Sequence, residues 1–187
     1  MRKILITFVV MVAASVMTGC APSLHPFFTD ANIIFNDQLL GEWKNDSGEI
    51  CKFTKSGEDS YEFLYVDKDA AKFKARLIEL DGENYLDLYP DDSDHGLARY
   101  LGNIVLAHIL ARVNITKDTI SLEMLNGDWI SKLSERNQLE LSYERLADGS
   151  IVLTASTPDL QTFVLKHAND RESFGDADVY YRRPNDE

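Results

Sequence analysis

Side chains suited to catalysis or metal binding are few in this chain and lie far apart. The four histidines, His25, His95, His108 and His167, are isolated from one another. His108 lies in the apolar stretch 106–110 without a second ligand at the His-x-His or Glu-x-x-His spacing of zinc sites. No Gly-x-Ser-x-Gly motif or glycine-rich phosphate loop occurs. We therefore predict no catalytic residue, cofactor or metal, although distant strands could still assemble an enzyme site that spacing does not reveal.

The acidic run at residues 91–96 contains the oxygen ligands that calcium prefers. Asp91, Asp92 and Asp94 supply carboxylates, and Gly96 permits a tight turn. The run lacks the alternating ligands and terminal glutamate of an EF-hand loop. This favours an acidic, solvated loop over a calcium site.

The acidic balance excludes one class of partner. The 187 residues carry a net charge of −12. Nucleic-acid phosphates require a basic surface, so we predict no nucleic-acid binding. Of the two cysteines, Cys51 alternates with Phe53 in a strand-like run, which favours a small buried hydrophobe over a reactive thiol.

The other cysteine follows a short apolar segment at the start of the chain. Arg2 and Lys3 form a basic flank, and residues 4–16 are apolar apart from two hydroxyl side chains. A spanning helix needs about 20 apolar residues, so this segment fits the core of a signal peptide better. Gly19 then directly precedes Cys20.

This arrangement resembles the lipobox of bacterial lipoproteins, with Met17 where leucine is usual. The resemblance implies cleavage before Cys20, lipidation of its thiol and acylation of its new amine, so that the protein contacts the bilayer through Cys20. Because Ala21 is not aspartate, it also implies transfer to the outer membrane, facing the periplasm, if the source has two membranes. Two or more acyl chains make such attachment stable.

The chain is thereby divided into three parts. Residues 1–19 are predicted to be the signal peptide, 20–37 a lipid-anchored tether with an apolar segment that packs, and 38–187 a single barrel-like domain. Removal of residues 1–19 leaves 17 basic and 31 acidic side chains, a net charge of −14.

Period-two alternation dominates from Leu39 onward and predicts a mainly β fold. Turn signals such as Asp81-Gly82 separate the apolar-polar runs, which suggests an antiparallel meander closed into a barrel or half-barrel. The clearest runs are 61–66, 72–77, 119–124 and 151–155, with 139–146 a weaker one.

Two short helices are expected late in the chain. Residues 128–136 begin with a capping aspartate and carry a short apolar stripe. Thr157-Pro158-Asp159 reads as a second helix start, with Thr157 as N-cap, followed by apolar side chains at helical spacing up to His167.

Gly41-Glu42-Trp43 at the first predicted strand resembles lipocalins, small barrels that bind apolar ligands. The resemblance implies that Trp43 closes one end of the barrel, with Arg182 or Arg183 lying across it. A guanidinium over an indole is a cation–π contact, which requires roughly 6 Å to the ring centroid. The other lipocalin motifs are not apparent, which leaves a different barrel or a sandwich as the alternative architecture.

Three classes of function remain: a ligand-binding barrel, an envelope assembly protein that uses an apolar patch on a protein partner, and an enzyme. An aromatic band on two adjacent predicted strands would either fill a solid core or line a cavity for a small apolar ligand. The candidate ligand-binding residues are Tyr61, Phe63, Tyr65, Phe73 and Leu77.

Overall fold

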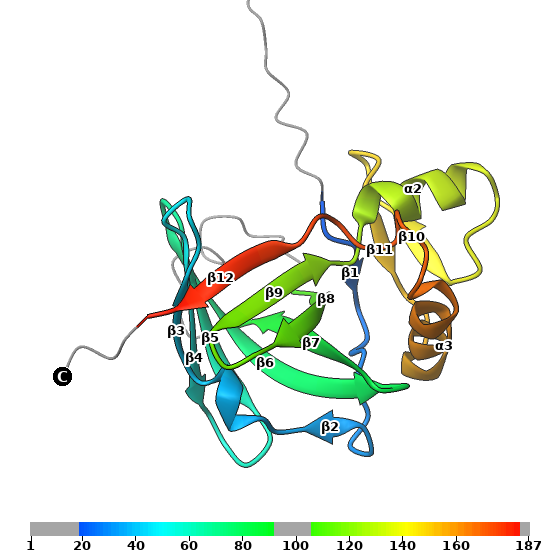
Figure 1. Cartoon of the computed structure of the whole chain (residues 1–187). Helices are drawn as coiled ribbons and strands as arrows, with labels where there is room; N and C mark the ends of the chain where they lie inside the picture. Colours follow the sequence, from blue (N-terminus) through cyan, green and yellow to red (C-terminus); the bar gives the residue numbers. More distant parts are fainter. Residues whose placement is uncertain (1–18, 92–105, 184–187) are drawn as a thin grey trace, which may run out of the picture.

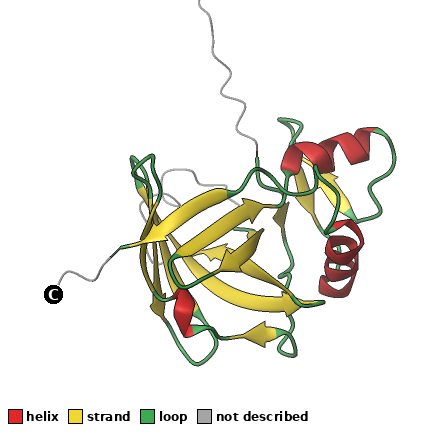
Figure 2. Ribbon diagram, viewed as in Figure 1, coloured by secondary structure: helices red, strands yellow, loops and turns green. Residues whose placement is uncertain are grey.

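Eight strands with alternating apolar side chains close into an antiparallel barrel, with two helices packed on one side (Figures 1 and 2). The computed structural model describes residues 19–91 and 106–183. The expected mainly β fold with two late helices is confirmed, and the barrel is fully closed. Residues 1–18 of the predicted signal peptide (1–19) and residues 92–96 of the acidic run lie outside the described residues.

The barrel wall is a meander closed by its last strand. β12 pairs with β3 on one side and with β9 on the other, and β9 pairs with β8, which completes the circle. In order round the wall the strands are β3 (Gly41–Lys44), β4 (Ile50–Lys55), β5 (Tyr61–Val66), β6 (Ala70–Leu80), β7 (Glu83–Pro90), β8 (His108–Ile115), β9 (Thr119–Met124) and β12 (Asp178–Arg182).

The tightest hairpin shows how local sequence sets the register. Only Asp81 and Gly82 separate β6 from β7, and their φ angles are +51° and +82°. Two-residue hairpins of this type need positive φ at both positions, which Asp-Gly sequences adopt readily.

A side layer covers the outer face of β6, β7 and β8. Its apolar side chains, including Trp129 and Phe163, pack on Ile78, Tyr85 and Leu110 from the barrel wall. This part of the sheet is therefore buried on both faces. The side layer comprises β1 (Pro22–Ser23), α2 (Gly127–Glu135), β10 (Tyr143–Arg145), β11 (Ile151–Leu153) and α3 (Thr157–His167).

Residues 20–37, expected to begin as a tether, are instead part of the fold. β1 pairs with β8 and β11, β2 (Ile33–Ile34) pairs with β6, and η1 (Asp37–Leu39) is a short 3-10 helix. Ala21 and Phe27 are buried at 2% and 0% exposure. The reason is an open edge: β9 pairs with β8 only from Ala111 onward, so the first residues of β8 accept β1.

Three local expectations need correction. The first late helix begins at Gly127, and its N-cap is Asn126 rather than Asp128, because the Asn126 side chain accepts hydrogen bonds from the Asp128 and Trp129 amides. The strand expected at 139–146 is confined to Tyr143–Arg145, because Leu139 and Leu141 pack instead into the side-layer core. The second helix has Ser156 rather than Thr157 as its N-cap, and the Thr157 hydroxyl donates a hydrogen bond to the Pro26 carbonyl at 2.7 Å.

Candidate functional site

The barrel has two chemically different ends. η1 and the β4–β5, β6–β7 and β8–β9 turns lie at one end, which we call the sealed end. The β3–β4 and β5–β6 turns and the start of β12 lie at the other, which we call the polar end. In Figure 1, η1 lies at the lower end of the barrel and the polar end points upward.

Trp43 closes the sealed end from inside. Its indole is 0% exposed, and Nε1 donates a hydrogen bond to the Leu39 carbonyl of η1 at 2.9 Å. Leu39 is also 0% exposed. The short helix is thus fastened across the barrel by an apolar contact and a buried hydrogen bond.

Arg182, and not Arg183, lies across this plug. The Arg182 guanidinium carbon is 3.9 Å from the centroid of the Trp43 ring. Its nitrogens donate to three carbonyls, those of Lys117, Leu40 and Gln38. Arg183 points elsewhere and pairs with Glu42 at 2.8 Å.

The same contact accounts for the glycine two residues before Trp43. Gly41 has a φ of +119°, and a Cβ there would lie 3.2 Å from Arg182 Nη1. Both the backbone conformation and the close guanidinium therefore favour glycine. Gly41, Trp43 and Arg182 form one structural unit.

The predicted aromatic band lies inside the barrel as a continuous stack. Phe53 and Phe63 stack at 4.6 Å between ring centroids, and Phe63 meets Phe73 at 5.7 Å. Tyr61 meets Phe53 edge-on at 6.3 Å. Leu77 is in the same core and fully buried. Sequence reasoning missed Phe53, although it alternates with Cys51 toward the interior.

Burial changes along this stack. Tyr61 is 0% and Phe63 4% exposed, whereas Tyr65 and Phe73 are only half-buried. Ile109 and Met124, from the opposite wall, are also half-buried and pack against the same core. These four side chains form what we call the apolar rim, which belongs to the polar end.

Acidic and hydroxyl side chains lie beside the apolar rim. The Tyr180 hydroxyl is 3.5 Å from a Glu49 carboxylate oxygen, and Tyr180 is 3% exposed. Asp178 begins the same strand. Sequence reasoning missed these three residues, although Tyr180 shares its strand face with Arg182 and could have been placed inside.

Burial weakens the acidity of this group. It raises the pKa of Tyr65 to about 12, helped by the negative charge of Glu49. It raises the pKa of the Cys51 thiol to about 12 as well, and it raises those of Tyr180 and Asp178. At neutral pH the two phenols and the thiol are therefore uncharged and can donate hydrogen bonds. Because the nucleophilic form of cysteine is the thiolate, the uncharged thiol of Cys51 is a poor nucleophile.

His108 lies outside the barrel in a structural contact. Its Nδ1 is 2.7 Å from Asp87 Oδ1, while Asp87 Oδ2 accepts a hydrogen bond from the Phe27 backbone amide at 2.8 Å. Phe28 meets the imidazole edge-on at 6.2 Å. The pair fastens the amino-terminal segment to the barrel, a role that sequence spacing did not reveal for Asp87.

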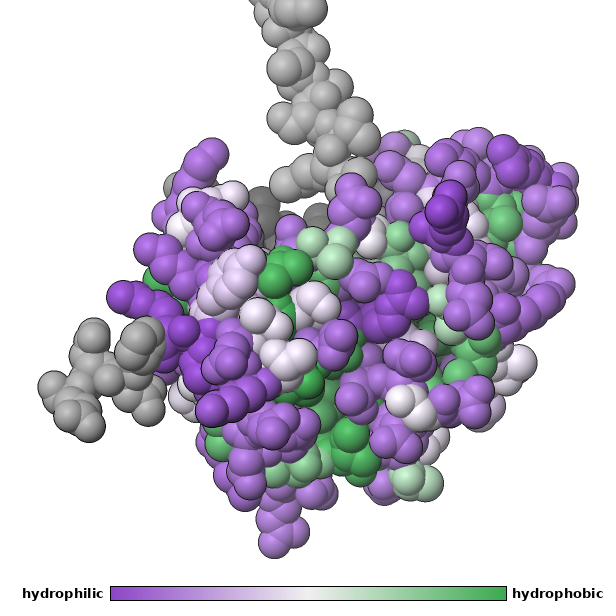
Figure 3. Space-filling view, in the orientation of Figure 1, coloured by the Kyte–Doolittle hydropathy of each residue, from purple (hydrophilic) through white to green (hydrophobic). Residues whose placement is uncertain are grey.

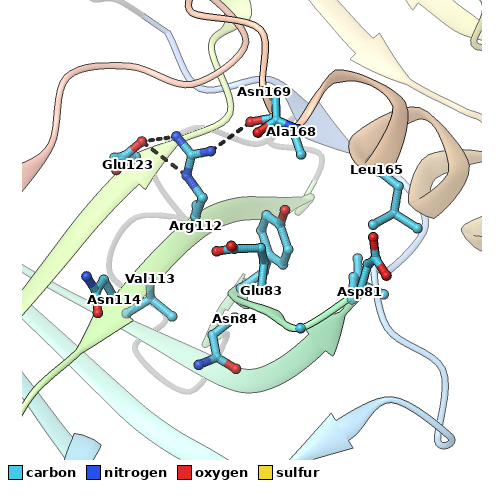
Figure 4. A pocket seen from close by; sticks show the side chains of 13 residues that line it. Asp81, Glu83, Asn84, Arg112, Val113, Asn114, Glu123, Leu165, Ala168 and Asn169 are labelled. Carbon is cyan, nitrogen blue, oxygen red and sulfur yellow. Dashed lines mark hydrogen bonds and ion pairs between the residues drawn. The ribbon is translucent and has the colours of Figure 1, made fainter.

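A hollow of about 520 Å³ lies on the outer wall beside α3 (Figure 4). Arg112 crosses it, binding Glu123 through Nε at 3.1 Å and the Ala168 carbonyl through Nη1 at 2.8 Å. These contacts hold the end of α3 against the barrel. Tyr85 and Asn84 line the hollow, and each has a buried oxygen without a hydrogen-bond partner among the described residues.

No cluster of three or more His, Cys, Asp or Glu side chains suited to a metal ion occurs in the described part of the chain. Within residues 19–91 and 106–183, no helix is long and apolar enough to cross a membrane. Comparison with protein-family models, curated proteins and solved structures found no match.

Proposed function

We propose that this protein is a lipid-anchored barrel of the bacterial envelope that binds a small amphiphile at its polar end. The observation that carries the proposal is the difference between the two ends. Trp43, Leu39 and Arg182 fill the sealed end, whereas apolar side chains remain half-exposed at the polar end.

The apolar rim is suited to a hydrocarbon chain. Tyr65 and Phe73 present aromatic surface, and Ile109 and Met124 present flexible aliphatic surface from the facing wall. Covering such side chains removes apolar area from water and is favourable by about 25 cal/mol per Å². Phe63 and Phe53 are already stacked on each other on the inner side of the apolar rim. The hydrocarbon chain of a ligand would therefore occupy only the part of the barrel nearest the polar end.

The neighbouring polar groups select the head of the ligand. Glu49 and Asp178 offer carboxylates beside the apolar rim. The groove that Asp178 lines also holds the carboxylates of Glu172 and Asp176, which outnumber its two cations, Lys132 and Arg171. A cationic or hydrogen-bond-donating head, such as a primary amine, would gain from these carboxylates. A free fatty acid would bring another negative charge to the same place.

The envelope location is proposed from the Gly19-Cys20 pair and the apolar segment before it. Lipidated Cys20 would hold the acidic domain on a membrane that its net charge does not favour. Ala21 supports placement at the outer membrane, facing the periplasm. The lipocalin resemblance of Gly41 and Trp43 fits the same proposal.

Displacement of a neutral fluorescent probe, N-phenylnaphthylamine, tests the proposed binding. Dodecylamine and dodecanoate have the same chain and opposite charges, and dodecylamine is expected to displace the probe at lower concentration. Glu49→Gln should reduce the difference between the concentrations of dodecylamine and dodecanoate that displace the probe. Glu62→Gln, on the exposed outer face of β5, should leave it unchanged. Absence of probe binding to the wild type would refute a ligand-binding barrel.

An exposed apolar strip on β12 favours a second candidate, assembly with an envelope protein. Val179 and Tyr181 lie two residues apart on the outer face and are 40% and 49% exposed. Figure 3 shows hydrophobic and neutral residues interrupting the hydrophilic surface on this side of the molecule. A photoreactive residue at Val179 that forms a stoichiometric cross-link in cells, when one at Glu62 does not, would favour assembly.

A further inference from the structure

The fold begins at the residue expected to carry the lipid. Cys20 forms a β-bridge with Asn126, and the Ala21 amide donates a hydrogen bond to the Leu125 carbonyl at 3.1 Å. Ala21 is 2% exposed and β1 starts at the next residue. No flexible residue separates Cys20 from the domain.

We propose that the anchor has no tether, so that the polar end of the barrel is held directly against a phospholipid bilayer. This inference rests on the proposed lipidation of Cys20. Asn126 lies two residues beyond Met124, which ends β9 at the polar end. Figure 1 shows the chain entering the fold there, beside the start of α2.

The chain also has a place for the acylated amine of Cys20. The Gly127 amide donates a hydrogen bond to the Gly19 carbonyl at 2.7 Å, at the N-terminus of α2. Hydrolysis of the Gly19–Cys20 bond removes that carbonyl. When the freed amine attacks an acyl ester, the ester alcohol leaves and a new amide forms on the same nitrogen. The carbonyl of the new acyl group then takes the position of the Gly19 carbonyl. The first methylene of the acyl chain takes the position of the Gly19 Cα.

Close packing at Gly127 supports this exchange. A Cβ at residue 127 would lie 2.2 Å from the Gly19 oxygen and 3.1 Å from the Cys20 oxygen. Glycine thus lets the carbonyl approach the helix N-terminus, where the macrodipole favours a partial negative charge. Anchor and helix would be joined by the same hydrogen bond before and after processing.

Charge alone does not explain this orientation. A groove of about 540 Å³ beside Gly19 is bordered by Lys132 and Arg171 but also by Glu172, Asp176 and Asp178. The surface has no basic excess to attract anionic headgroups. The short covalent link through lipidated Cys20 would therefore set the orientation of the domain on the bilayer. It also places the apolar rim where an amphiphile can pass to or from the bilayer.

Fluorescence quenching in proteoliposomes tests the orientation. The full lipidated protein is placed in phosphatidylcholine vesicles containing a nitroxide-labelled phospholipid. A fluorophore is attached to cysteine at Asp176→Cys, near the anchor, or at Asp118→Cys, in the β8–β9 turn of the sealed end; both sites are exposed. Buried Cys51, with its thiol pKa raised to about 12, should remain unlabelled.

Quenching at residue 176 is expected to exceed quenching at residue 118 several-fold. A Gly/Ser linker of about ten residues between Cys20 and Ala21 should abolish the difference. Gly127→Ala should reduce it, whereas Gly175→Ala, where a Cβ would make only ordinary contacts, should not. Equal quenching at both sites in a chain whose mass shows lipid on Cys20 would overturn this inference alone. A chain without that lipid would overturn the proposed anchor as well.

Discussion

The two ends of the barrel use similar types of residue, but only one of them is filled. At the sealed end an aromatic ring, a cation and backbone carbonyls satisfy one another: Trp43 donates to Leu39, and Arg182 covers Trp43. At the polar end aromatic rings meet carboxylates, and Tyr65 and Phe73 remain half-exposed. The first arrangement is complete without a ligand, whereas the second leaves apolar surface and acidic groups that a ligand could cover. The aromatic stack joins them, so side chains of one type differ in role according to depth.

The largest effect is expected from removing the plug. Trp43→Ala deletes a fully buried indole, leaves a cavity and removes the cation–π contact. The free energy of unfolding should fall by about 3–5 kcal/mol in urea denaturation. Tyr181→Ala, on the exposed outer face, should cost less than about 0.5 kcal/mol. Similar losses for both variants would contradict the sealed end.

Truncation along the aromatic stack should show the gradient between the ends. Phe63→Ala is expected to cost about 3 kcal/mol, because the ring is 4% exposed and lies between the rings of Phe53 and Phe73. Phe73→Ala, at the half-exposed apolar rim, should cost about 1–2 kcal/mol and weaken probe binding more than Phe63→Ala does. An equal stability loss with no change in binding would show that the barrel is a solid core throughout.

Replacing each arginine with alanine should show that Arg182 contributes more to stability than Arg183. Arg182→Ala leaves the carbonyls of Leu40, Gln38 and Lys117 without this donor and should cost about 2 kcal/mol. Arg183→Ala breaks only the exposed pair with Glu42 and should cost at most about 0.5 kcal/mol. Thermal unfolding of the two variants under one set of conditions provides the measurement.

The smallest effect concerns pH at the polar end. Burial raises the pKa of Asp178 in the folded state, so its contribution to stability is full at low pH and is lost as pH rises through that raised value. Asp178→Asn should therefore stabilise the protein at pH 7, by less than about 1 kcal/mol because Asp178 is exposed to solvent. The gain should vanish near pH 3. A loss of stability at pH 7 would show that the charged Asp178 side chain stabilises the folded state, which contradicts this prediction.

The sequence revealed the elements better than their assembly. Alternation and Asp81-Gly82 predicted the strands, and Gly41-Glu42-Trp43 pointed to the Arg182 contact. The pairing of β1 with β8 depends on where β9 stops, which local pattern does not encode. Glu49 and Tyr180 come together only because β12 closes the barrel, and they are 131 positions apart in sequence.

One methyl group can test the central claim directly. Met124 is the only methionine after residue 17, and it belongs to the apolar rim, while the Trp43 indole belongs to the sealed end. In protein labelled at methionine methyl and tryptophan indole positions, titration with dodecylamine should shift the Met124 methyl NMR signal in a saturable way. The Trp43 indole signal should stay in place. An unchanged Met124 signal, or a larger shift at Trp43, would contradict a barrel that is sealed at one end and binds its ligand at the other.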